Sequence, residues 1–347
     1  MARGPQLSEI TARLTALGAK PAHVRRLCLA WMGKADWTAK KSDSYPKGIA
    51  ENLDRIRSEF ESLSHALPVR SVEAESMKLI IGLADGECVE SVLLPRQGLC
   101  VSTQVGCAVG CVFCMTGKGG LVRQLSSAEI LAQVREGLKV RPDIRKVVMM
   151  GMGEPSHNLA AVTEAVEFLG NTLGLGHKDI VISTVGDRRL FKRLPELSVK
   201  PALALSLHTT DNEKRRRLLP NSPAIPVEEL LETVCAYAEA TKYPAQIEWT
   251  LMAGVNDSEA EVERLADLIA GRHAMVNFIA VNPIPGSPYR RPDNAHMQDL
   301  ITILRRRGTV ATIRDSAAQD VEGGCGQLRA RVIEIERREA AQKQEAQ

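Results

Sequence analysis

The sequence predicts an α/β fold, a partial (β/α)6 barrel that follows a small N-terminal helical domain and a short β extension. Two observations support this prediction. Between residues 99 and 282, short apolar segments alternate with helical patterns, and such alternation is typical of a parallel sheet with right-handed crossovers. It runs through six units rather than the eight of a closed barrel, so we expect the barrel to stay open.

Residues 1–65 are expected to form a basic, helical accessory domain. Apolar residues recur at helical spacing over 7–17, 24–32 and 49–60. Residues 1–60 contain 11 Lys and Arg against 6 Asp and Glu. Such a local excess of positive charge favours a polyanionic partner.

Residues 66–95 are predicted to be the β extension, which carries Glu90. Apolar segments at 77–82 and 88–94 flank a turn at Asp85-Gly86, which is the pattern of two strands joined by a tight connection. The α/β core is expected over 96–330, and the charge-rich residues 331–347 are expected to be a C-terminal helix or tail.

The core elements follow one another along the chain. The predicted strands lie near residues 99–103, 146–151, 180–184, 202–207, 246–251 and 276–282, with a further strand near 309–313. The predicted helices lie near residues 127–139, 158–172, 188–196, 211–218, 227–241 and 257–271.

Polar and glycine residues follow these predicted strands. Because the carboxyl ends of parallel barrel strands form one rim, we expect the side chains at these ends to lie close together. Turn residues follow most strands, so the convergence on one rim indicates a site more strongly than any single residue. The candidates are Gly153, Glu154, Ser183, Ser206, Leu207, His208 and Asn282.

Three cysteines after the first core strand are the most informative motif. Cys107, Cys111 and Cys114 have the spacing C-x3-C-x2-C. Three thiolates on one loop can bind three irons of a 4Fe–4S cluster and leave the fourth iron open for S-adenosylmethionine (SAM), whose reductive cleavage releases a 5′-deoxyadenosyl radical. The protein then holds, orients and shields the cofactor. A zinc site is the alternative, but it needs four ligands and the next Cys or His downstream is His157.

Composition limits the location and the partners. No apolar run is long enough to span a bilayer, and the N-terminus lacks the apolar core of a secretory signal, so we expect a cytoplasmic protein without a membrane partner. Eight cysteines in thiol-dependent motifs also fit a reducing compartment. The net charge is only +3, but basic runs occur at residues 188–193, 214–217, 290–291 and 305–307.

Several motifs together resemble the radical-SAM RNA adenine methyltransferases of the RlmN/Cfr type. The resemblance covers nearly the whole chain, and its most specific parts are the string from Cys100 to Cys114 and the late Cys325-Gly-Gln-Leu328. It implies a barrel of the radical-SAM type and one 4Fe–4S cluster per chain on the three cysteines. SAM, as methyl donor and radical source, would contact Gly153, Glu154, Ser183, Ser206, Leu207, His208 and Asn282.

The resemblance also implies roles for three residues outside the cluster. The ring carbons of adenine are poor nucleophiles, so they cannot take the methyl group of SAM directly. In the implied route the thiolate of Cys325 first accepts a methyl group, forming S-methylcysteine. A radical derived from a second SAM activates this methyl group, which adds to the ring. Glu90 accepts the ring proton, and Cys100 attacks the sulfur of Cys325, which frees the RNA and leaves a transient disulfide.

The implied substrate is adenine in rRNA or tRNA, with C2 favoured over C8, and residues 20–31 resemble RNA-binding helices of the family. A monomer served by an electron donor such as flavodoxin or ferredoxin is expected. The chain departs from the family pattern in the short loop Pro95–Gln97, at Gln124, and around Ala318 and Gly323-Gly324. Two alternatives therefore stay open: a radical-SAM enzyme with a non-RNA substrate, and a non-catalytic iron–sulfur or RNA-binding protein.

Overall fold

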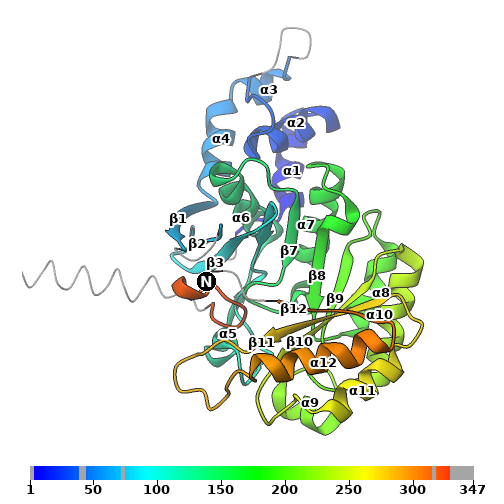
Figure 1. The fold of residues 1–347 in the computed structure, drawn as a ribbon. Coiled ribbons are helices and arrows are strands. Elements are labelled where there is room, and N and C mark those ends of the chain that lie inside the picture. The colour runs from blue at the N-terminus through cyan, green and yellow to red at the C-terminus, as the bar shows by residue number, and fades with distance from the viewer. Residues whose placement is uncertain (1–3, 39–43, 72–74, 315–317, 329–347) are drawn as a thin grey trace, which may run out of the picture.

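The computed structural model describes residues 4–38, 44–71, 75–314 and 318–328. Within them, ten strands form one sheet in the order β1-β2-β3-β4-β7-β8-β9-β10-β11-β12, and β5 and β6 form a separate pair (Figure 1). The strands are β1 (Ser64–Arg70), β2 (Met77–Leu83), β3 (Cys88–Leu94), β4 (Gly98–Cys100), β5 (Gln104–Gly106), β6 (Leu121–Gln124), β7 (Lys146–Met149), β8 (Ile180–Thr184), β9 (Ala202–Ser206), β10 (Ala245–Leu251), β11 (Ala274–Ala280) and β12 (Val310–Arg314).

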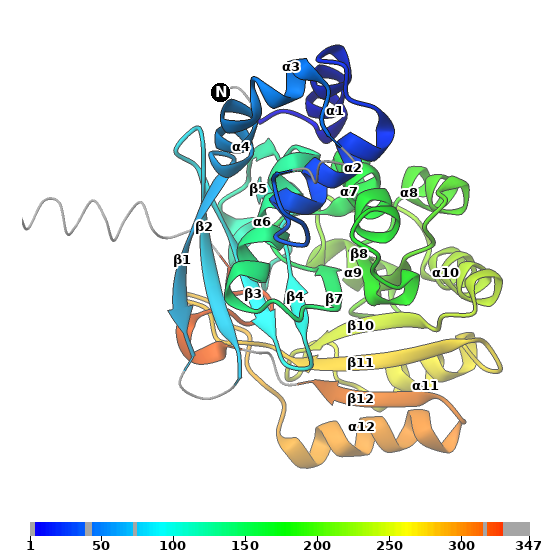
Figure 2. The same ribbon diagram turned by 90° about the horizontal axis from the view of Figure 1, so that it is seen from above.

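The sheet is mixed. Strands β1 to β4 pair antiparallel, whereas β4 and β7 to β12 pair parallel. Its edges β1 and β12 do not pair with each other in the described ranges, and Figure 2 shows the curved, open arrangement. The predicted α/β class and open barrel are confirmed. The predicted tail at 331–347 lies outside the described residues.

The helices of the described residues are α1 (Leu7–Ala16), α2 (Pro21–Trp31), α3 (Lys47–Ala50), α4 (Leu53–Glu61), α5 (Met115–Lys118), α6 (Ser127–Val140), α7 (Leu159–Asn171), α8 (Arg188–Arg193), α9 (Asn212–Leu218), α10 (Val227–Thr241), α11 (Glu259–Leu268) and α12 (Asn294–Arg306). Of these, α6, α7, α10 and α12 pack against the outer face of the sheet. No helix in the described part of the chain is long and apolar enough to cross a membrane.

The N-terminal helices α1, α2 and α4 contact α6 and α7 (Figure 1). Trp31 lies between Phe60 and Phe168, with ring centroids 4.9 and 6.4 Å away. The amide of Leu7 donates to Ser127 Oγ at 2.8 Å. The apolar core is therefore continuous from these helices into the barrel.

Two strand predictions need correction. Strand β1 was not predicted, because Leu67 is exposed and Pro68 interrupts the apolar pattern. The predicted strand at 99–103 ends early, at Cys100. Side chains take over the backbone bonding there, because the amide of Ser102 donates to Gln133 Oε1 at 2.8 Å and Ser102 Oγ donates to the carbonyl of Glu90 at 2.6 Å.

The register of the sheet decides which side chains share the concave face. Paired residues on neighbouring strands point to the same side, as do alternate residues along one strand. Val92 pairs with Cys100, and Ser206 pairs with Glu248. Traced across every pairing, this rule puts one set of polar residues on a single face: Lys78, Glu90, Cys100, Lys146, Ser183, Ser206, Glu248, Asn277 and Arg314.

Candidate active site

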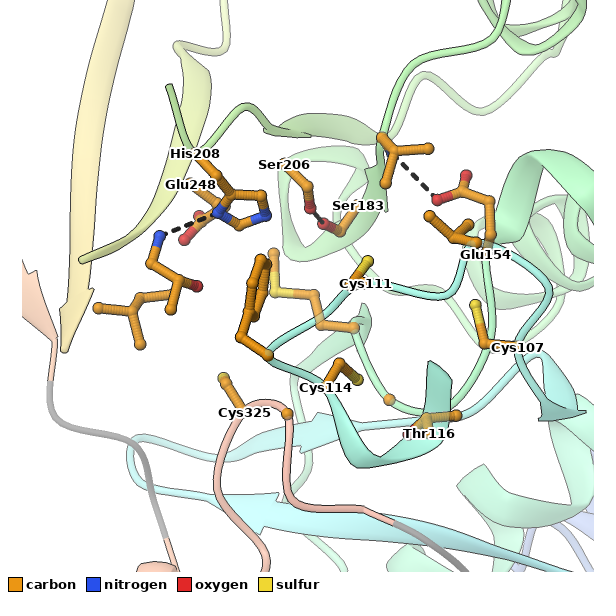
Figure 3. A pocket seen from close by; sticks show the side chains of 18 of the residues that line it. Cys107, Cys111, Cys114, Thr116, Glu154, Ser183, Ser206, His208, Glu248 and Cys325 are labelled. Carbon is orange, nitrogen blue, oxygen red and sulfur yellow. Dashed lines mark hydrogen bonds between the residues drawn. The ribbon is translucent and has the colours of Figure 1, made fainter. Parts of the chain in front are cut away.

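A cavity opens at the carboxyl ends of the parallel strands (Figure 3). It collects most of the predicted site residues from loops that are far apart in the sequence. Those that line it are Cys107, Cys111, Cys114, Gly153, Glu154, Ser183, Ser206, His208, Asn282 and Cys325. Leu207, Cys100 and Glu90 are not among its lining residues.

The cysteine loop is framed by the small β5–β6 sheet and by α5. The amide of Cys107 donates to the carbonyl of Gly120 at 2.9 Å, which closes the base of the loop. Gly106 has φ 78°, and a Cβ atom there would lie 2.0 Å from the same carbonyl oxygen, so only glycine fits. The loop is thereby held so that all three thiols reach the cavity.

The thiols fit a cluster better than a single ion. Burial, and then the charges of the nearby Cys114 and Glu154, raise the pKa of Cys107 to about 11. Burial and the two neighbouring thiols also raise the pKa of Cys111. Thiolates packed this closely need a compensating positive charge, which bound iron supplies. In the described residues no three Cys, His, Asp or Glu side chains converge on a position for one metal ion.

Glu154 is a buried carboxylate fixed by three donors. Its oxygens accept from Ser156 N at 3.0 Å, Thr184 Oγ1 at 2.6 Å and Val185 N at 3.0 Å. The preceding Gly153 has φ 101°, and a Cβ atom there would lie 2.6 Å from Gln104 Cβ. A carboxylate has about four acceptor positions, so Glu154 retains capacity for a cationic ligand in the cavity.

Strands β8 and β9 end in two serines and a histidine. Ser183 Oγ and Ser206 Oγ lie 3.3 Å apart on the cavity side. The buried His208 accepts a hydrogen bond from Thr250 N through Nδ1 at 2.9 Å, which leaves the proton on Nε2. Burial, and then the charge of Arg215, lower the pKa of His208 to about 3, so the ring is neutral. Leu207 instead packs into the core, so only its main chain faces this rim.

The Cys325 segment is attached to the rim at several points. Asn282 Nδ2 donates to the carbonyl of Cys325 at 2.8 Å. The amide of Met115 donates to Gly326 O at 2.8 Å, and Thr116 Oγ1 donates to Leu328 O at 2.7 Å. The exposed Cys325 therefore stands at the mouth of the cavity, next to the helix that follows the cluster cysteines.

Cys100 lies behind the cavity, at the end of β4. Burial, and then the charge of Cys325, raise its pKa to about 12, so the two thiols lie within electrostatic range of each other. Glu90, on the adjacent strand β3, is 1 % exposed and has Lys78 Nζ at 3.4 Å from its Oε1 atom. Because its main-chain carbonyl accepts from Ser102 Oγ, Glu90 is held beside the residues that follow Cys100.

Sequence reasoning missed two charged residues here. Glu248 lines the cavity and accepts from Asn277 Nδ2 at 2.7 Å, and burial raises its pKa. A charged residue inside an apolar strand was the available signal. Arg215 belongs to the basic run at residues 214–217, yet it is buried and donates through Nη2 to Ser206 O at 3.1 Å.

The comparisons with known proteins agree with this site. The radical SAM superfamily model matches residues 101–269. A "Probable RNA methyltransferase" from Ectopseudomonas mendocina (strain ymp) is 50% identical over 335 residues, covering 95% of this chain and 96% of that protein. A similarly named protein from Azoarcus sp. (strain BH72) is 51% identical over 336 residues, with 96% of each chain covered.

This chain belongs to the radical SAM methyltransferases. A solved structure supports the assignment: a radical SAM methyltransferase from Sphaerobacter thermophilus has a TM-score of 0.80 and 35% identity, and the match covers 94% of this chain and 98% of that one. Membership implies a 4Fe–4S cluster and SAM. When bound, these supply the radical, while the protein orients the reactants and excludes water.

Proposed function

We propose that this methyltransferase transfers a methyl group to a ring carbon of adenine in rRNA or tRNA, at C2 rather than C8. In this proposal Cys107, Cys111 and Cys114 hold the cluster. SAM is held by Glu154 at its ammonium group and by Ser183, Ser206 and Asn282 at its ribose and carboxylate. The names of the relatives support RNA as the substrate class.

The methyl-transfer part of the proposal is supported by one observation, the effect of the Cys325 charge on the pKa of Cys100. The two thiols come from opposite ends of the core, yet they are close enough for the charge of one to affect the other. In the proposed route Cys325 carries the methyl group to adenine. Glu90 takes the ring proton. Cys100 then attacks the Cys325 sulfur, which forms the S–S bond, breaks the bond from sulfur to the methylene carbon and releases the RNA. The methylene carbon takes up a proton to become the methyl group, and the one electron that remains would pass to the oxidised cluster.

The RNA backbone is proposed to bind the N-terminal helices and the exposed basic residues near α8. Arg188 pairs with Glu229, and Arg193 pairs with Glu196, at exposed positions. Exposed ion pairs contribute about 0–1 kcal/mol each, so RNA phosphates can compete for these arginines. The target adenine must leave its stack to reach the cavity.

Mass spectrometry of the Cys325 peptide after anaerobic reconstitution with iron, sulfide and SAM tests the intermediate. We expect a methyl group on Cys325, and its absence would contradict the proposed route. Cys100→Ala, expressed in cells, should accumulate a covalent RNA–protein adduct. Cys235→Ala, which removes a buried thiol on α10, is the matched control and should give none.

The trapped adduct also tests the substrate. Nuclease digestion and sequencing of its RNA would identify the modified adenine. Methylated Cys325 together with an adduct that contains no RNA would favour the alternative, a radical SAM enzyme that acts on a non-RNA substrate. The short loop at Pro95–Gln97 before Cys100, where Arg96 and Gln97 both have positive φ, is the feature that favours this alternative.

A further inference from the structure

Lys78 and Glu90 form a buried ion pair on the concave face of the β extension. Lys78 Nζ lies 3.4 Å from Glu90 Oε1, and the two side chains are 10% and 1% exposed. Sequence reasoning assigned no role to Lys78. Burying two charges has a desolvation cost that often exceeds their mutual attraction, so stability alone does not explain why a lysine stands here.

The register connects this pair to Cys100. Val92 on β3 is the partner of Lys78 on β2 and also of Cys100 on β4. Glu90 is two residues from Val92 on the same strand, so its side chain points to the same face. Lys78, Glu90 and Cys100 therefore occupy three adjacent strands and face one side.

A carboxylate must be ionised before it can accept a proton, and burial opposes ionisation. A neighbouring ammonium group reverses this effect because it stabilises the charged carboxylate. The same contact restricts the rotation of the Glu90 carboxylate. Other titratable groups that the register places on this face include His65, Cys100, Lys146 and Arg314.

We propose that Lys78 is the positioning residue for Glu90, which keeps the carboxylate ionised and directed for proton removal from the adenine ring carbon. The proposal rests on the proposed function of Glu90. In this step the ring C–H bond breaks, its electron pair stays with the ring, and an O–H bond forms on Glu90. Lys78 keeps its own proton throughout.

The test compares Lys78→Met with the control Lys139→Met, which removes a lysine from an ion pair with Glu136 on α6. Each reconstituted enzyme receives SAM and total cellular RNA as the probe. Three quantities are measured: methyl on Cys325, covalent RNA adduct, and methyladenosine released as a function of pH. Methylation of Cys325 precedes proton removal, so it reports folding and SAM binding independently of Glu90.

For Lys78→Met we expect normal methylation of Cys325, more adduct and slower release of methyladenosine. In a plot of the methyladenosine release rate against pH, the rate falls at acidic pH as the carboxylate becomes protonated. The midpoint of this acidic limb should move to higher pH by about 1 to 3 units, because the buried carboxylate has lost its cation. Lys78→Arg should restore the wild-type limb, and Lys139→Met should not change it.

An unchanged acidic limb in Lys78→Met would overturn the proposal, as would equal losses of Cys325 methylation and methyladenosine release. If Lys78→Met does not fold, Lys78→Gln, which retains a hydrogen-bond donor, is measured instead with the same expected shift. Failure of the proposed function is distinguishable, because wild-type enzyme would then give no methyl on Cys325 or no methyladenosine.

Discussion

The proposed cluster loop, residues 104–124, and the proposed methyl-transfer corner, formed by Glu90, Cys100 and Cys325, are built in opposite ways. The loop is one continuous segment, closed by the bond from Cys107 N to Gly120 O. The corner combines the β extension, the first barrel strand and the C-terminal segment. A local motif forms its geometry from its own turns, whereas the corner exists only when the whole barrel is folded.

The largest expected effect separates the two regions. Cys111→Ala should bind less iron and produce no 5′-deoxyadenosine from SAM, because one cluster ligand is lost. Cys325→Ala should keep its iron and still cleave SAM, but yield no methylated RNA. Iron analysis and chromatography of the SAM products measure the difference. Equal iron loss in both variants would show that the two regions are not independent.

A second prediction concerns His208, which follows β9 and lines the cavity. His208 has its pKa lowered to about 3 in the folded protein, against about 6.5 when unfolded. The unfolded chain therefore binds the additional proton as the pH falls through this window. The free energy of unfolding should decrease by about 2 kcal/mol between pH 7.5 and 5 through this residue.

Urea denaturation of wild type and His208→Gln at both pH values measures this contribution. The remaining six histidines of the chain are present in both proteins. The two proteins therefore differ in how much their free energy of unfolding changes between pH 7.5 and 5, and this difference isolates His208. If the free energy of unfolding changed equally with pH in both proteins, the His208 ring would have to become protonated in the folded state.

The smallest effect should come from the hydrogen bond that attaches the Cys325 segment to Asn282. Asn282→Ala removes the hydrogen bond to the carbonyl of Cys325, which is worth about 0.5–1.5 kcal/mol. Because Asn282 is also a proposed SAM contact, the rate is compared at saturating SAM, where we expect methylation of Cys325 to slow about two- to tenfold, measured by mass spectrometry over time. Asn171→Ala, on the outer helix α7, is the control. A full rate in Asn282→Ala would show that the other attachments of the segment suffice.

The sequence predicted well those features that depend on residues close together along the chain. The spacing of Cys107, Cys111 and Cys114 indicated the cluster loop, and the alternation of strands and helices predicted the open barrel. The sequence predicted poorly which charged residues are buried and which are exposed. Arg215 looked like its basic neighbours, but the fold buries it beneath Ser206 while Lys214 pairs with Glu261.

The sequence by itself determined the fold class, the cysteine loop and the set of polar residues at the strand ends, because periodicity and spacing are local properties. Only the tertiary structure decided which of these residues share a face. Side chains alternate along every strand, so the register of β2, β3 and β4 had to be known before Lys78, Glu90 and Cys100 could be assigned to one side. The electrostatic effect of Cys325 on Cys100 likewise depends on long-range packing, which leaves no periodic signal in the chain.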